Sequence, residues 1–203
     1  MKRPAGEAEA ALVSAVERLL QSHLPQEITT TMVLRAANVA RGTLYRHFED
    51  LDALIEKSLV AAFRHSVELN ISLLLNAIDS ARSTEELLLG FEKILEASQS
   101  RSLKGFRFLR ARLIAYSEGN ERLRGVLALE QDQLTSKFEG LLRRLIDKGW
   151  FREDLDLRVT SVFIQAFTLG KVIDDFTPVP MNEAAWNRLM MQIIRNVLMM
   201  PRR

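Results

Sequence analysis

Apolar residues recur at intervals of three and four positions along almost the whole chain, and no segment shows a strict alternation of apolar and polar residues. The first spacing places apolar side chains on one face of an α-helix, whereas a half-buried β-strand requires alternation. Glycine and proline, the residues that most often interrupt helices, number only 9 and 5 among 203 residues. We therefore predict an all-α fold of about nine helices.

Capping and breaking residues indicate where the predicted helices begin and end. The threonine run Thr29–Thr31 offers N-cap oxygens. Asn38 tolerates a left-handed turn, and Gly149 is typical of the position after a helix C-terminus. The predicted helices span about residues 7–22, 30–37, 41–47, 50–79, 84–100, 103–117, 121–148, 157–176 and 183–200.

The predicted helices fall into two groups by length. The first three are short and lie in residues 1–50, which we predict to be an N-terminal three-helix domain. Residues 51–203 carry longer helices and are predicted to form a larger helical domain. The helix that begins near Asp50 links the two, because it starts at the end of the first domain and continues into the second.

The stretch most informative about function is residues 28–50, with the sequence ITTTMVLRAANVARGTLYRHFED. Two short helices joined by a tight turn, at about residues 30–49, form a helix-turn-helix. Its second helix can lie in the major groove of DNA while the first braces it across the backbone. Donors on the outer surface suit phosphates and base edges. The candidate DNA-binding residues are Thr30, Thr31, Arg41, Gly42, Thr43, Tyr45, Arg46 and His47.

Two of these residues have alternative interpretations. Tyr45 is also compatible with a half-buried packing role, although the neighbouring Arg41 and Arg46 favour a phosphate contact. His47 precedes the acidic pair Glu49–Asp50 and is also compatible with a solvated or capping role. The net charge is only +2, so positive charge for DNA binding must be concentrated locally.

The run from Gly42 to Phe48 (GTLYRHF), preceded by Ala36–Val39, resembles the helix-turn-helix of the TetR family of bacterial transcriptional regulators. The resemblance implies a homodimeric repressor that binds a (pseudo)palindromic operator and responds to a small molecule. Three positions depart from the family pattern. Ala40 stands where a serine or threonine usually caps the recognition helix, Leu51 where a lysine commonly contacts the DNA backbone, and Asn38 where the turn glycine is usual.

The last two predicted helices carry the pattern expected of a dimer interface. The helix at 157–176 is apolar almost all round, and the helix at 183–200 has a continuous apolar stripe. A helix that is apolar on every side must be covered on every side, either by its own chain or by a second subunit. TetR-like regulators typically dimerise through these helices. The candidate interface residues are Val162, Ile173, Trp186, Met190, Ile194 and Val197.

The resemblance also implies that the middle helices enclose a site for a small apolar or amphipathic effector. The alternative is that the same residues form an ordinary core. Gln131 and Tyr116 would be the polar groups of such a site. The candidate residues are Phe106, Leu109, Leu113, Tyr116, Gln131, Leu134, Phe138, Phe163 and Phe167.

Other classes of function lack their sequence signatures. The chain has no cysteine, and none of His23, His47 and His65 has a glutamate three positions before it, which disfavours thiolate sites and di-metal bundle sites. No phosphate-binding glycine loop or nucleophile elbow occurs. We therefore predict a protein that is not an enzyme and needs no metal or cofactor. The remaining alternative is a helical adaptor or ligand-binding protein of the same fold that has lost DNA binding.

The expected compartment is the cytoplasm. No apolar stretch approaches the roughly 20 residues that a membrane-spanning helix needs. The charges in Met1–Pro4 are not followed by the apolar run of a secretory signal.

Overall fold

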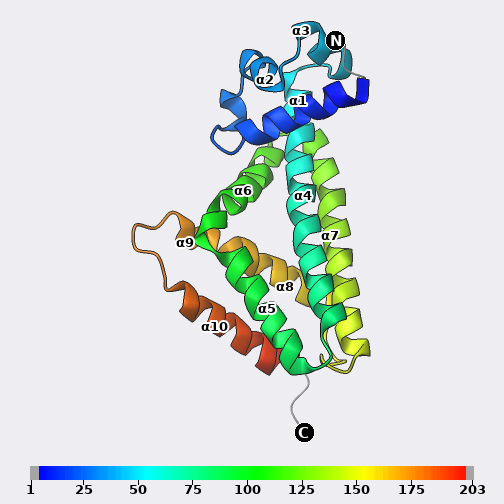
Figure 1. Cartoon of the computed structure of the whole chain (residues 1–203), viewed down its shortest axis with the longest axis vertical. Helices are drawn as coiled ribbons and strands as arrows, with labels where there is room; N and C mark the ends of the chain where they lie inside the picture. Colours follow the sequence, from blue (N-terminus) through cyan, green and yellow to red (C-terminus); the bar gives the residue numbers. More distant parts are fainter. Residues whose placement is uncertain (1–4, 200–203) are drawn as a thin grey trace. The chain divides into compact units, whose positions relative to one another are not determined.

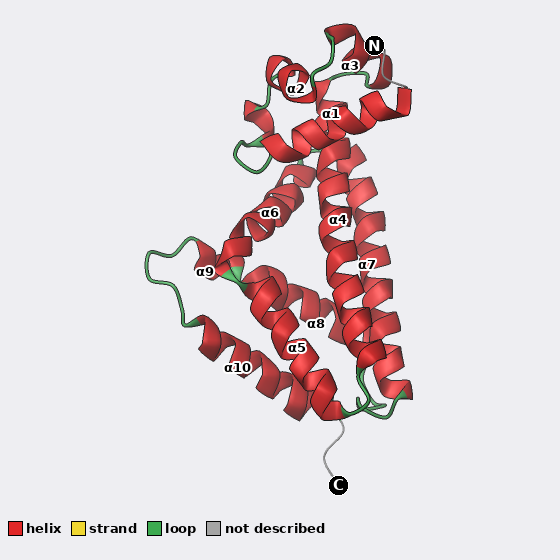
Figure 2. Cartoon of the chain, in the orientation of Figure 1, coloured by secondary structure: helices red, strands yellow, loops and turns green. Residues whose placement is uncertain are grey.

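The computed structural model describes residues 5–199, which form helices joined by loops (Figure 2). Residues 1–4, considered above for a targeting signal, and the predicted helix end at Met200 lie outside this range. Nine α-helices in it have seven or more residues, which confirms the all-α prediction. They are α1 (Ala5–Leu19), α2 (Thr30–Ala37), α3 (Arg41–His47), α4 (Leu51–Ser80), α5 (Thr84–Gln99), α6 (Lys104–Glu118), α7 (Glu121–Asp147), α8 (Leu157–Gly170) and α10 (Glu183–Ile193).

Shorter elements complete the described chain. They are the four-residue helix α9 (Val172–Asp175), the 3-10 turns Pro25–Glu27 and Arg101–Leu103, and a π-helical turn at Ile194–Leu198. Between residues 5 and 199 no strand forms, and an isolated β-bridge joins Phe151 to Met199. None of the described helices is both long and apolar enough to cross a membrane.

The chain divides into two compact units. The first contains the described residues up to Ser66 together with Arg112–Leu127, and the second contains Val67–Ala111 together with the described residues from Ala128 on. The divisions therefore fall inside α4, α6 and α7. The predicted three-helix domain is part of the first unit, which also takes in the first half of α4 and the turn between α6 and α7.

In the first unit α1 packs against α2 and α3 (Figure 1). The shared core is made of aliphatic side chains at helical spacing, which is the physical reason these short helices hold together. Burying one such side chain stabilises the fold by about 1.5–3 kcal/mol. The apolar core residues with no more than 3% exposure are Leu12, Ala15, Val16, Leu20, Ile28, Val33, Leu44, Leu54, Ile55, Leu59, Leu113 and Leu123.

The second unit has its own core. There α5 and α10 pack side by side (Figure 1), and Asp79 of α4 accepts a hydrogen bond from Arg144 of α7 at 3.1 Å. Ser83 caps α5 by accepting a hydrogen bond from the backbone N–H of Glu86. The core residues of this unit include Ile78, Leu87, Leu88, Phe91, Leu134, Leu141, Leu142, Leu145, Met190 and Met191.

The predicted helix over 157–176 is interrupted at Lys171. Its first part, α8, ends at Gly170, and α9 begins at Val172. The Lys171 ammonium is buried, donates to the carbonyl oxygen of Gln99, and lies 3.0 Å from a carboxylate oxygen of Glu183. The break follows Gly170, a poor helix former, and Lys171 makes these tertiary contacts at the same point. The helical spacing of apolar residues does not reveal it.

A buried ion pair holds α9 to α6. The Arg107 guanidinium contacts the Asp175 carboxylate through Nε at 2.5 Å and NH2 at 2.7 Å. The same guanidinium donates to the carbonyl oxygens of Ser98 and Ser100 at the end of α5. Both charged side chains are at most 6% exposed. Hydrogen bonding to Arg107 lowers the pKa of Asp175, so the pair is ionised at neutral pH.

Candidate nucleic-acid interface

Local capping chemistry forms the turn between α2 and α3. The Thr29 hydroxyl accepts from the backbone N–H of Met32 and begins α2. Asn38 ends α2 in the left-handed region, at φ 52° and ψ 53°, and is the one non-glycine residue with positive φ among the residues described. An asparagine tolerates this conformation better than most side chains. The turn therefore forms without the glycine that usually occupies it.

The start of α3 lacks a side-chain cap. Ala40 occupies the N-cap position and its side chain makes no capping hydrogen bond, whereas its carbonyl oxygen accepts from the Thr43 N–H at 2.9 Å. An N-cap side chain typically contributes about 1 kcal/mol. The orientation of α3 consequently depends mainly on packing rather than on its own termini.

The inner faces of α2 and α3 supply that packing. Val33 and Leu44 are fully buried, and Ala37 and Phe48 are at most 8% exposed. In addition, Arg18 of α1 donates to the carbonyl oxygen of Ala36 at 3.1 Å. These contacts fix α3 against α1 and α2 and leave its opposite face outward.

The outer face of α3 carries four of the eight predicted DNA-binding residues. Arg41, Gly42 and Arg46 are exposed, and Tyr45 is 48% exposed. The Arg41 guanidinium lies 5.7 Å from the centre of the Tyr45 ring, close enough for a cation–π interaction. Thr43 is half-buried, and on α2 Thr31 is exposed and Thr30 half-buried.

His47 is placed differently from the rest of the predicted set. Its side chain is only 10% exposed, with Nδ1 3.8 Å from a carboxylate oxygen of Glu9 on α1. Its Nε2 atom is buried without a hydrogen-bond partner. His47 therefore lies on the packed side of α3, and we leave it out of the outward-facing surface. This position could not be predicted from neighbouring residues, because Glu9 is far away along the chain.

Glu9 also connects α1 to α4. Its carboxylate accepts a hydrogen bond from the Lys57 ammonium, and this bond lowers the pKa of Glu9. Asp50 begins α4 by accepting from the backbone N–H of Ala53 at 2.7 Å. Leu51, at the family's usual lysine position, is the half-buried first residue of α4. The start of α4 is thus held by an acidic cap and by a contact to α1.

The turn between α6 and α7 is joined to α4 by a second polar cluster in the first unit. The buried carboxylate of Glu56 accepts from Asn120 Nδ2 at 2.5 Å and from Arg122 Nε at 2.9 Å. Asn120 also begins α7, because its Oδ1 accepts from the Leu123 N–H. Sequence reasoning missed this cluster, since Glu56 and Arg122 lie on separate helices.

The predicted effector residues are divided between the units. Leu113 and Tyr116 belong to the first unit, where burial, with the nearby charges of Asp52 and Glu56, raises the pKa of Tyr116. The other seven belong to the second unit. Of these, Leu134 is buried, Phe106 and Phe163 are exposed, and Leu109, Gln131, Phe138 and Phe167 are half-buried.

Polar side chains that the sequence analysis did not select surround Gln131. Arg110 of α6 donates to Gln131 Oε1 at 3.2 Å, and Gln131 Nε2 donates to Gln165 Oε1 of α8 at 2.6 Å. Gln165 in turn donates to the Thr135 hydroxyl at 3.2 Å. Among residues 5–199 no group of three acidic or histidine side chains is arranged to hold a metal ion.

The predicted dimer residues all lie in the second unit, with different exposures. Three of them are at least half exposed: Val162 at 52%, Ile173 at 71% and Val197 at 50%. Their apolar side chains are therefore accessible to a partner. Trp186 and Ile194 are half-buried. Met190 is 5% exposed, because it packs within its own protomer, so its side chain is not available to a partner.

Searches with protein-family models and against curated proteins find no match to this sequence. Solved structures do match over nearly the whole chain. A transcriptional regulator of the TetR family from Cytophaga hutchinsonii has a TM-score of 0.73 at 12% identity, with 100% of both chains covered. A protein from Mesorhizobium loti described as a TetR-family regulator has a TM-score of 0.77 at 11% identity, covering 98% of this chain and 100% of that one.

A third match differs in carrying a ligand. It is a protein from Saccharomonospora viridis described as a transcriptional regulator, solved in complex with choline, with a TM-score of 0.73 at 14% identity over 97% of this chain and 100% of that one. At such identities the agreement concerns the fold, which extends through both units and includes the helix-turn-helix. The chain described here has the fold of the TetR-type transcriptional regulators.

Proposed function

We propose that this protein is a DNA-binding transcriptional repressor that acts in the cytoplasm as a homodimer and responds to a small amphipathic effector. The observation that carries the proposal is the outer face of α3. A helix held by a buried core presents Arg41, Tyr45 and Arg46 outward, and these donors suit phosphates and base edges. The shared fold with proteins described as transcriptional regulators supports a regulatory role over a catalytic one.

Dimerisation is supported by two independent arguments. A single short recognition helix reads too few base pairs for selectivity, so two copies on a (pseudo)palindromic operator are expected. In addition, α8 and α9 leave Val159, Val162, Phe163 and Ile173 between 44% and 71% exposed. An exposed apolar surface of this kind favours a protein partner, and a second copy of the chain satisfies both arguments.

Effector control would act through α4. This helix begins directly after the recognition segment, and its 30 residues give a length of about 45 Å at 1.5 Å per residue. Its first half belongs to the first unit and its second half to the second. Two recognition helices must lie about 34–36 Å apart to enter successive major grooves. An effector that binds the protein more tightly when α4 has one orientation than when it has another would therefore change operator affinity. The coupling free energy between two such sites is typically about 1–3 kcal/mol.

The uncapped start of α3 favours a second candidate, a helical ligand-binding protein that has lost DNA binding. Ala40 provides no cap, and Leu51 provides no charge for the phosphate backbone. Retention on duplex DNA at low salt separates the candidates, because a protein of the second kind would elute without delay.

The experiment that tests the proposal is selection of bound duplexes from a random pool by the full chain. We expect enrichment of a (pseudo)palindrome whose half-sites are centred about 10 base pairs apart, or a multiple of that distance. A pool that stays random after repeated rounds would contradict the proposed function.

A further inference from the structure

The turn between α6 and α7 lies beside the first turns of α4 (Figure 1), and Glu56 of α4 joins the two. Its carboxylate is only 11% exposed, and both of its oxygens bond to the turn. Oε1 accepts from Asn120 Nδ2 at 2.5 Å, and Oε2 accepts from Arg122 Nε at 2.9 Å and lies 2.7 Å from Arg122 NH2. Charge-assisted hydrogen bonds of this kind are strong and directional.

Asn120 connects this contact to the start of α7. Its Oδ1 accepts from the Leu123 N–H at 3.0 Å while its Nδ2 donates to Glu56, so both ends of its amide are bonded. The Leu123 side chain is itself buried in the core of the first unit. The turn therefore cannot shift along α4 without breaking the cap of α7 or removing a partner from a nearly buried carboxylate, and both changes are unfavourable.

The place of Glu56 along α4 links this contact to the recognition helix. α3 ends at His47 and α4 begins at Leu51, so Glu56 lies in the second turn of the helix that follows α3 almost directly. A change in the direction of this helix start is therefore passed on to α3. In addition, α6 and α7 both continue from the turn into the second unit, as α4 does from its own first half. Glu56 thus joins three helices that each extend into both units.

We propose that Glu56 is a positioning residue for operator binding: by holding the turn between α6 and α7, it fixes the direction in which the start of α4 carries the recognition helix. This inference rests on the proposed function, and it adds α6 and α7 to α4 as a connection through which the effector acts. Two recognition helices must lie about 34–36 Å apart to enter successive major grooves. A looser start of α4 would broaden that separation and make the protein more tolerant of the spacing between half-sites.

Glu56→Gln in the full chain distinguishes positioning from a simple effect of charge. The substitution nearly preserves shape and removes a negative charge, so electrostatics alone would tighten binding to DNA. We expect instead that affinity for the selected duplex falls by about 3- to 30-fold.

The selectivity for spacing is the decisive measurement. The second probe is the selected duplex with one base pair inserted between its half-sites. The wild-type chain should discriminate against this duplex, whereas Glu56→Gln should lose most of that discrimination. A loss of stability alone lowers the affinity for both duplexes by the same factor and leaves their ratio unchanged.

Variants of the turn locate the contact. Arg122→Met should behave like Glu56→Gln, and the double variant should be no worse than either, because all three remove the same contact. Arg122→Lys keeps the positive charge and should keep most of the discrimination. Arg124→Gln is the matched control, because Arg124 pairs with Glu121 within α7 at 3.5 Å. Arg122 is 59% exposed, so Arg122→Met keeps the test valid if Glu56→Gln does not fold.

Hydrogen exchange of the full chain without DNA measures the contact itself. Exchange over residues 119–124 and 51–57 should become faster in Glu56→Gln and Arg122→Met but not in Arg124→Gln. Two results would overturn the inference: a ratio of duplex affinities equal to that of the wild type in both variants, or unchanged exchange in both. A pool from which no duplex is selected contradicts the proposed function instead, and the exchange rates then support or overturn the contact assigned to Glu56.

Discussion

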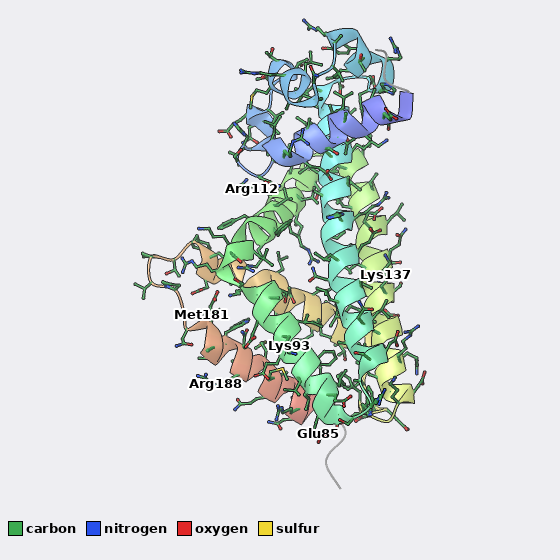
Figure 3. The ribbon with its side chains drawn as sticks, viewed as in Figure 1. Glu85, Lys93, Arg112, Lys137, Met181 and Arg188 are labelled. Atoms are coloured by element: carbon green, nitrogen blue, oxygen red, sulfur yellow. The ribbon has the colours of Figure 1, made fainter. Side chains whose placement is uncertain are left out.

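Tyr45 and Arg46 lie on the outer face of α3, where neither takes part in the core of the first unit. We predict that Tyr45→Ala and Arg46→Ala each weaken operator binding by about 10- to 100-fold, because each removes a hydrogen bond to a charged phosphate. Anisotropy titration with the selected duplex measures the loss, and circular dichroism checks the fold. Lys137→Ala, an exposed change on α7 (Figure 3), is the charge-matched control. Unchanged affinity in both α3 variants would place the DNA-contacting surface elsewhere.

Gly42 permits a sharper test, because a methyl group there meets no protein atom. A Cβ built at Gly42 has nothing within 4 Å, and alanine is a better helix former than glycine by about 0.5–1 kcal/mol. We predict that Gly42→Ala leaves stability equal or slightly higher and yet weakens operator binding, because the methyl group would separate the α3 backbone from DNA. Gly105→Ala, at an equally open helical position, should leave binding unchanged. Equal operator affinity for both variants would show that this backbone does not approach DNA closely.

Residues whose conformation depends on sequence neighbours could be predicted from the sequence. The Thr29 cap and the left-handed Asn38 are of this kind, since each needs only a few adjacent residues. The inward position of His47 could not be predicted, because it depends on Glu9 of α1. The same holds for Arg110. Its hydrogen bond to Gln131 depends on how α6 packs against α7, which the residues next to either side chain do not determine.

At the scale of helices, the predicted bounds of α2 and α7 agree closely with the structure, because an N-cap residue and an uninterrupted periodicity mark each of them. The bounds of α3 agree as well, although its start lacks a side-chain cap. The sequence did not locate the break between α8 and α9, where Lys171 and Asp175 are held by partners on α5 and α6. The spacing of apolar residues indicates which face of a helix is buried. It does not indicate where a charged residue with a partner on another helix coincides with the end of the helix.

The ion pair between Arg107 and Asp175 should make a pH-dependent contribution to the free energy of unfolding. The pKa of Asp175 is lowered in the folded state, so its stabilising effect is full above the ordinary carboxyl pKa of about 4. That effect disappears as the pH falls through the lowered value. We predict that Asp175→Asn costs about 3–5 kcal/mol at pH 7, because it leaves Arg107 buried without its anion.

Urea unfolding at several pH values measures this contribution. The difference between wild type and Asp175→Asn should persist from pH 7 to pH 5 and shrink below about pH 4. Asp154→Asn is the control, because Asp154 pairs with Arg152 at the surface, where solvent screens the interaction and little change is expected. A difference between wild type and Asp175→Asn that stays constant with pH would contradict the assigned role of the ion pair.

At the scale of the whole molecule, the proposed dimer makes a prediction about α8 and α9. We predict that Val162→Glu and Ile173→Glu each produce monomers, because each places a charge in an apolar interface. Both side chains are more than half exposed in the protomer, so neither change should unfold it. Leu89→Glu, at a 58% exposed position on α5, should remain dimeric. Sedimentation that finds intact dimers for both α8 and α9 variants would rule out this interface.

Hydroxyl-radical footprinting of the selected duplex tests most directly the claim that two copies of α3 read DNA. The account predicts two protected segments on one face of the duplex, with centres about 10 base pairs apart, matching recognition helices about 34–36 Å apart. The Tyr45→Ala variant should weaken both segments together. A single protected segment, or uniform protection without any preferred position, would contradict the account.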